Sequence, residues 1–344
     1  MRPCARTRCG GRWSITAATT VRKCERILAA LCLAFLAAAN TRAVIDRAVE
    51  RAFAVPANAS ASLDVETFYG AIKITRGTGS AIHVVARETI EADSEAQADR
   101  ELRNLDLHIT DKTSPTSETV TVRAAFRRTV HWTWEKWPPL GLSFEIEIPE
   151  RCQLRLVSRE GAITVPAVQG DVEVRAQNGE TFLGAITGAA TVKSGVGNVI
   201  VTSCTGRLVI DAHAGNVSVG RLQSSAQIDA VGGTIEVQAS HGDLRIHGDG
   251  ADVQVGFVYP IRGDADVRAS GGDLQASFET GVEAKLDVHA STFGQVRVRE
   301  LELSYISGRP GDAHVTGTLG RSGPLLQLRA GGGNVRLRGV PAAR

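Results

Sequence analysis

The sequence predicts an all-β protein built as a parallel β-helix, or β-solenoid, with about eighteen residues per rung. Glycine recurs every nine residues between positions 161 and 250, with Ser224 in place of one glycine, and mostly apolar residues follow two and four positions later. Such alternation is typical of strands, and a fixed period is typical of stacked repeats. The glycines of this pattern are Gly161, Gly170, Gly179, Gly188, Gly197, Gly206, Gly215, Gly233 and Gly242.

The full period is eighteen rather than nine, because alternate nine-residue units differ. Equivalent positions of successive eighteen-residue units hold side chains of one size class. Each can therefore pack on its copy about 4.8 Å away in the next rung. We expect two short strands per rung, with glycines at corners that need a positive φ or a close backbone approach. Two columns are Val174, Val192, Ile210, Ile228, Ile246 and Ala176, Ser194, Ala212, Ala230, Gly248.

Residues 1–43 are predicted to be a signal segment for export. Arg22, Lys23 and Arg26 precede thirteen mostly apolar residues, Ile27–Ala39, and small residues follow as cleavage sites. Thirteen residues are fewer than the roughly 20 that a transmembrane helix needs. The expected mature chain therefore keeps no stable transmembrane anchor. A membrane anchor or a buried core helix is the alternative interpretation of this segment.

The charge distribution argues against nucleic-acid binding. The formal net charge is +2, but residues 1–43 hold eight Lys and Arg side chains and a single acid. The rest of the chain is therefore slightly acidic, at about −5. It offers no basic surface for a phosphate backbone.

Two cysteines, Cys152 and Cys204, lie outside the signal segment. They are 52 residues apart, nearly three rungs, which is roughly 14 Å at the strand spacing. A disulfide requires Cα atoms within about 7 Å, so we expect no bridge. Cys204 shares an apolar column with Ile186 and Leu222, which predicts a buried thiol rather than a reactive one.

Residues 44–149 are predicted to form an N-terminal β-rich part. The segment 92–105 is its one convincing helix, because it lacks Gly and Pro and places Ala98, Leu102 and Leu105 on one face. Strands are expected at Ala52–Val55, Ala61–Glu66, Gly70–Ile74, Ile82–Arg87, Leu107–Thr110 and Val120–Phe126.

A Trp-rich loop at 127–142 interrupts this pattern. It holds Trp132, Trp134 and Trp137, followed by two prolines. An exposed aromatic loop would bind a sugar or a peptide. A hydrophobic plug would instead cover the end of the solenoid, where strand edges and core are otherwise open.

Residues 150–344 are predicted to form the solenoid, as one continuous domain with the preceding part. The glycine pattern loosens beyond Gly250, with strands expected at Val282–His289 and Gln295–Arg299. Gly308–Gly323 is expected to be a loop, and residues 325–337 the closing rung.

No catalytic, cofactor-binding or metal-ligating set emerges from the sequence. Calcium-binding β-rolls share a nonapeptide glycine repeat but need an aspartate at the sixth place of each unit. Cations at that place repel calcium, which is bound by oxygen ligands. In this chain the place holds Arg175, Lys193, Asp211, Asp229 and His247.

Asp211 and Asp229 are the best outward polar pair. Stacked one rung apart, they would suit a carbohydrate-active solenoid enzyme. They equally suit a solvated charge ladder in which Lys193 offsets Asp211, and this interpretation is favoured. His213 is expected on another face, so no catalytic triad is evident.

Phe182 and Ile200 form the least ordinary outward feature. Both occupy the nominally outward fourth place of neighbouring rungs, where they make an apolar strip. The strip is either covered by the N-terminal segment or the helix at 92–105, or it is a partner surface. The strip and the three tryptophans are the candidate interaction residues.

With its rungs laid out, the sequence resembles the bacterial putative adhesin family of β-strand-repeat proteins of unknown function. It also looks similar to the head domains of putative autotransporter adhesins. The resemblance implies an exported, right-handed β-solenoid without known catalytic residues, and the tryptophan segment departs from the family pattern. The matching segments are Phe144–Pro149, Gly170–Val174, Gly197–Val201 and Leu326–Leu337.

These features together predict an exported, non-enzymatic β-solenoid that acts as an adhesin-like binding or structural module in the bacterial periplasm or at the cell surface. Its expected partner is an envelope protein or a glycan, with no cofactor and no metal. One alternative is a carbohydrate-active enzyme that uses Asp211 and Asp229. Another is an envelope-stress signalling component.

Overall fold

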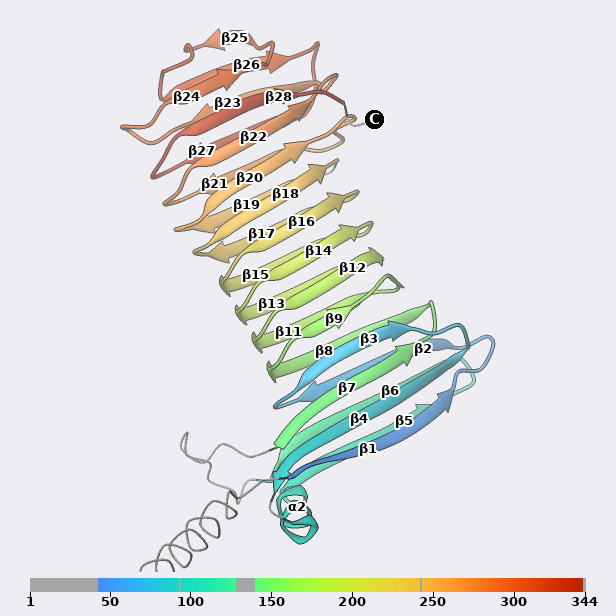
Figure 1. The fold of residues 1–344 in the computed structure, drawn as a ribbon. Coiled ribbons are helices and arrows are strands. Elements are labelled where there is room, and N and C mark those ends of the chain that lie inside the picture. The colour runs from blue at the N-terminus through green and yellow to red at the C-terminus, as the bar shows by residue number, and fades with distance from the viewer. Residues whose placement is uncertain (1–42, 93, 128–139, 242, 343–344) are drawn as a thin grey trace, which may run out of the picture.

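The computed structural model describes residues 43–92, 94–127, 140–241 and 243–342. Within these residues the protein consists mainly of strands, with a single helix, and the strands form two sheets of 14 strands each. Figure 1 shows them stacked along one long axis. The predicted all-β class is confirmed.

The first sheet contains, in spatial order, β1 (Ala43–Ala54), β4 (Ala81–Ala92), β7 (Leu140–Ile148), β3 (Ala71–Arg76), β9 (Ile163–Val165), β12 (Thr181–Thr187), β14 (Val199–Cys204), β16 (Val217–Leu222), β18 (Thr234–Ser240), β20 (Asp252–Phe257), β22 (Leu274–Glu279), β28 (Val335–Val340) and β24 (Val296–Arg299), and β10 (Val168–Gln169) also pairs with β12. The second sheet contains β25 (Ser304–Ser307), β26 (His314–Leu319), β23 (Ala284–His289), β27 (Leu325–Ala330), β21 (Ala265–Ala269), β19 (Leu244–Asp249), β17 (Ala226–Val231), β15 (Leu208–Ala214), β13 (Ala190–Val196), β11 (Val172–Asn178), β8 (Cys152–Glu160), β2 (Ser60–Thr67), β6 (Ser117–Phe126) and β5 (Leu105–Thr113).

Through the middle of both sheets, neighbouring strands are parallel and pair residues eighteen positions apart. In the second sheet Val192 lies between Val174 and Ile210. In the first sheet Val201 lies between Leu183 and Val219. The predicted eighteen-residue period is therefore confirmed, together with the columns of like side chains.

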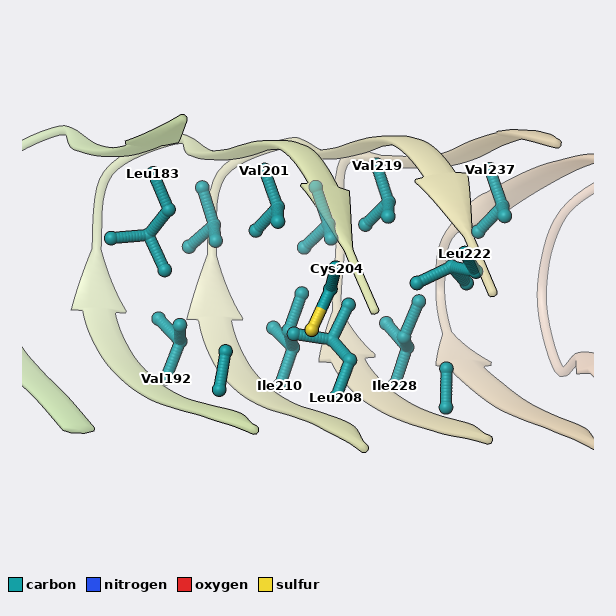
Figure 2. Close-up of a cluster of buried hydrophobic side chains, with 14 of the residues drawn as sticks. Leu183, Val192, Val201, Cys204, Leu208, Ile210, Val219, Leu222, Ile228 and Val237 are labelled. Atoms are coloured by element: carbon teal, nitrogen blue, oxygen red, sulfur yellow. The ribbon is translucent and has the colours of Figure 1, made fainter. Parts of the chain in front are cut away.

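Inward side chains of the two sheets form one continuous core. Figure 2 shows Val192, Ile210 and Ile228 on one side of it and Val201 and Val219 on the other. These β-branched side chains are stiff and pack well on a pleated surface, which suits a narrow interior.

Both described cysteines are buried, and both are free, as the rung spacing predicts. Cys204 lies in its column between Ile186 and Leu222. Its thiol lies 3.4 Å from the carbonyl oxygens of Gly188 and Gly206. Burial raises the pKa of Cys152 to about 12 and also raises that of Cys204. Both therefore behave as small apolar residues.

The corners of the repeat need glycine for two reasons. Gly197 has a φ of 136°, and a Cβ there would lie 2.1 Å from the carbonyl oxygen of Gly179 in the preceding rung. The residue after the corner adds a hydrogen bond between rungs. Asn198 Oδ1 accepts from the backbone N–H of Asn216, and Asn216 Oδ1 accepts from that of Thr234, each at 3.0 Å. The corners are thus tied together along the stack.

The N-terminal strands continue both sheets and do not form a separate unit. β2 pairs with β8, and β3 pairs with β9, both in parallel. Beyond them, β6 and β7 extend the two sheets, and β1, β4 and β5 pair antiparallel.

The helix α2 runs from Glu95 to Leu102, shorter than the predicted 92–105, because β4 extends to Ala92 and β5 begins at Leu105. Ser94 caps it by accepting a hydrogen bond from the backbone N–H of Gln97. In the described ranges, no helix is long and apolar enough to cross a membrane.

The C-terminal end differs from the sequence prediction in two ways. The predicted closing rung is not outermost, because β27 lies between β21 and β23, and β28 lies between β22 and β24. The predicted loop Gly308–Gly323 contains β26, which pairs antiparallel with β23. Its inward positions are Val315, Gly317 and Leu319, and the central glycine weakens the apolar alternation that marks a strand.

Candidate binding face

Phe182 of β12 and Ile200 of β14 are direct neighbours on the outer side of the first sheet. Phe182 remains 36% exposed and Ile200 is partly exposed, whereas the adjacent Leu183 and Val201 are buried. Successive side chains of a strand point to opposite faces, which explains this alternation. The outer face therefore presents an aromatic ring beside a branched aliphatic side chain.

The surroundings of this pair are uncharged. β9, β12 and β14 contain no charged residue. The column of the pair continues with Thr164 on one side and Ser218 on the other. The next residues of this column are charged, Lys73 on β3 beyond Thr164 and Glu236 on β18 beyond Ser218. We call the outer side of β9, β12 and β14, with Phe182 and Ile200 at its centre, the apolar strip.

The second sheet presents a different outer surface. Strands β11, β13, β15 and β17 each place a charged side chain outward. A solvated protein surface normally carries such groups. The outer side of β9, β12 and β14 departs from that pattern. These charged residues are Arg175, Lys193, Asp211 and Asp229.

The helix does not cover the apolar strip, so that expectation is wrong. α2 packs through Ala98 against Ile90, Ala92 and Leu140, a cluster separate from the main core. In Figure 1, α2 lies at the N-terminal end of the stack, far from β12. The helix follows β4 directly, so its short connection holds it there. The N-terminal segment 1–42, the other predicted cover, lies outside the described residues.

Trp132, Trp134 and Trp137 also lie outside the described residues. The binding loop and the end cap both stay predictions for this segment.

Asp211 and Asp229 are neighbours across β15 and β17, with Lys193 and His247 on either side in the same row. Oδ2 of Asp229 accepts a hydrogen bond of 2.9 Å from Gln227 of its own strand. The row is thus a ladder of mixed charges on the outer surface.

The placement of His213 corrects the sequence prediction. Its Nδ1 lies 3.9 Å from Oδ1 of Asp211, so both side chains share one face of β15. Residues two apart in a strand point the same way, so the spacing of Asp211 and His213 already places both on one face.

Asp287, His289 and His314 form a second polar group, which was not predicted from the sequence. Asp287 and His289 are two apart on β23, and that spacing alone could have placed them on one face. His314 belongs to β26, in the segment expected to be a loop. Its position opposite His289 depends on the antiparallel pairing of the two strands.

These features define an all-β repeat protein with an apolar strip on one outer face. No family model matches the chain, and no curated protein does either. It is similar to a putative adhesin from Parabacteroides merdae, with 8% identity, a TM-score of 0.34, and coverage of 85% of this chain and 96% of the other. It is similar to a putative adhesin from Parabacteroides distasonis, with 13% identity, a TM-score of 0.29, and coverage of 85% and 97%.

A putative cell adhesion protein from Clostridium sporogenes is also similar, with 8% identity, a TM-score of 0.24, and coverage of 86% and 100%. All three solved structures carry adhesin or adhesion names, as the sequence resemblance leads one to expect. At such identities and scores these similarities carry no argument about the activity of this chain.

Proposed function

We propose that this chain is an exported, right-handed β-solenoid that acts as a non-enzymatic, adhesin-like binding module of the bacterial envelope. The observation that carries the proposal is the apolar strip, where Phe182 is exposed and Ile200 partly exposed on strands without charged residues. The predicted signal segment supports export. Parallel pairing between residues eighteen positions apart supports the solenoid.

The strip suits a flat contact. An exposed aromatic ring beside an aliphatic side chain offers apolar area on a rigid sheet, which loses little conformational entropy on binding. Either the apolar face of a sugar ring or a protein surface could pack on it. Thr164 and Ser218 at its edges supply hydroxyl groups for hydrogen bonds to such a partner.

The test compares wild type with the double variant Phe182→Ser/Ile200→Ser. A matched control, Val196→Ser/Val231→Ser, removes two exposed apolar side chains from the second sheet, where they are 57% and 50% exposed. Binding to immobilised envelope proteins and envelope glycans is measured separately. We expect the first variant to lose at least about tenfold in affinity, as truncation of an interface anchor does, and the control to bind like wild type.

Circular dichroism of both variants, compared with wild type, checks that they fold. Equal partner binding by wild type and Phe182→Ser/Ile200→Ser would refute the role of the strip.

Export is tested separately. The full chain, expressed in a bacterial host, should leave the cytoplasm and lose a segment within or near residues 1–43. Fractionation and N-terminal mass spectrometry measure this. An unprocessed chain in the cytoplasm would contradict export.

The competing function is glycan cleavage by Asp211 and Asp229. The observation that favours glycan cleavage is the pairing of Asp211 with Asp229 across β15 and β17, which places two carboxyl groups in one row. Reducing-sugar release from envelope polysaccharides, abolished by Asp211→Asn, would establish it against the binding module.

A further inference from the structure

Three potential metal ligands converge on the outer side of the second sheet near its C-terminal end. Nε2 of His289 and Nε2 of His314 each lie 3.0 Å from the same oxygen, Oδ1 of Asp287. The three ligand atoms all lie within 4.8 Å of one another. Two strands build this group, since Asp287 and His289 belong to β23 and His314 lies opposite His289 on β26.

The separations match those of a metal centre. A tetrahedral zinc ion holds its ligand atoms at about 2.0–2.2 Å, which places them roughly 3.3 Å apart. Each imidazole nitrogen thus needs to move from the carboxylate oxygen by only a few tenths of an ångström. Two imidazoles and one carboxylate also form a donor set suited to first-row transition metals rather than to calcium or magnesium.

The second oxygen of Asp287 is already engaged by the neighbouring strand. Oδ2 lies 3.5 Å from Nε2 of Gln327 and 3.9 Å from Nη2 of Arg329, both on β27. Arg329 is shared with Asp266, whose Oδ1 lies 3.4 Å from its Nη1. Outer contacts of this kind orient a ligating carboxylate, and they leave Oδ1 facing the two histidines.

The imidazole rings have room to adjust. They are stacked with centroids 3.8 Å apart and planes 15° apart, whereas an ion must lie near the plane of each ring that binds it. Rotation about the Cβ–Cγ bond tilts each ring while moving Nε2 little, because Nε2 lies close to that axis at the far end of the ring. The side chains are 41% and 50% exposed, so the main contact that this rotation changes is the stacking of the two rings on each other.

We propose that Asp287, His289 and His314 bind one divalent first-row transition-metal ion, with Zn²⁺ the best match, and that the ion clamps β26 to β23. β26 lies between β23 and β25, and β25 is the last strand at the C-terminal edge of the second sheet. An ion that joins β26 to β23 would stabilise the exposed end of the stack. The proposal does not depend on the apolar strip.

The test measures Zn²⁺ binding by calorimetry to the full chain without a histidine tag, after treatment with a chelator. We expect an ion bound by wild type, and affinity at least about tenfold weaker in His289→Ala and in His314→Ala. His108→Ala is the matched control, because His108 contacts a single carboxylate, with Nε2 2.9 Å from Oδ1 of Asp106. Background binding by other cysteines and histidines is common to all variants.

Hydrogen exchange supplies a readout that keeps the proposal falsifiable. Zn²⁺ should slow exchange of the β26 amides in wild type and in His108→Ala, but not in His314→Ala. His314→Gln, which preserves the bulk of the side chain, replaces any alanine variant that does not fold. Zn²⁺ binding that is unchanged by the His289 and His314 substitutions would overturn the proposal. Unchanged β26 exchange in wild type at saturating Zn²⁺ would overturn the clamp.

Discussion

The corner at Gly197 offers the sharpest test of the stacked architecture. Gly197→Ala places a Cβ on a residue with a φ of 136°, which side chains rarely adopt and which costs about 1–3 kcal/mol. The new atom would also lie 2.1 Å from the carbonyl oxygen of Gly179, so one rung must shift. Overpacking of this kind costs about 1–3 kcal/mol more. We expect the two costs together to be clearly larger than either alone.

Gly250→Ala is the matched control. Gly250 has a φ of 67°, and a Cβ added there would have no heavy atom within 4 Å, so the substitution costs only the left-handed conformation, about 1–2 kcal/mol. Urea denaturation of both variants gives the difference in the free energy of unfolding. Hydrogen exchange of the β12 and β14 amides shows whether the loss is local, as expected where each rung contacts only its neighbours. Equal destabilisation by the two substitutions would refute the reasoning.

Three further predictions concern single side chains. Thr181 is fully buried, and its hydroxyl has no hydrogen-bond partner within the described part of the chain. Thr181→Val should therefore raise the free energy of unfolding by about 1 kcal/mol, measured by urea denaturation, and a lower free energy of unfolding would contradict this. Burial raises the pKa of Cys152 to about 12, so iodoacetamide at pH 8 should leave its thiol unmodified until the chain is unfolded. Peptide mass mapping measures the modification, and rapid labelling of the folded protein would disprove the prediction. The backbone N–H of Asn334 and the charge of Arg336 hold the pKa of Asp273 below its ordinary value despite partial burial. Asp273 therefore stabilises the fold above its unfolded pKa of about 3.9, and this contribution disappears as pH falls through its folded pKa. Asp273→Asn should therefore lose less stability than wild type as the pH falls below about 4. Parallel acid titrations followed by circular dichroism measure this, and equal losses of stability in the two proteins would contradict it.

The interior of the stack could be predicted from the sequence because its rule is local and repeated. Val174, Val192 and Ile210 recur at the eighteen-residue period, and strand alternation alone turns them inward. The same count places Phe182 and Ile200 outward as neighbours. The corner at Gly197 follows as well, since its requirement for glycine arises from the stacking of identical rungs.

The ends of the stack follow no such rule. β27 lies between β21 and β23, and β28 lies between β22 and β24, although both come last in the sequence. The helix α2 packs beside β4 and does not reach the apolar strip. Whether an outward residue is covered depends on contacts between segments distant in sequence, which periodicity does not encode.

The amino-acid sequence by itself determined the period, the inward columns, the corners and the outward position of Phe182 and Ile200, because neighbouring rungs repeat one local pattern. Only the tertiary structure decided that the apolar strip is free of α2, and that His314 meets Asp287 and His289. Those outcomes arise from the antiparallel pairing and strand insertion at the ends, where the repeat stops and long-range packing selects each strand's partner.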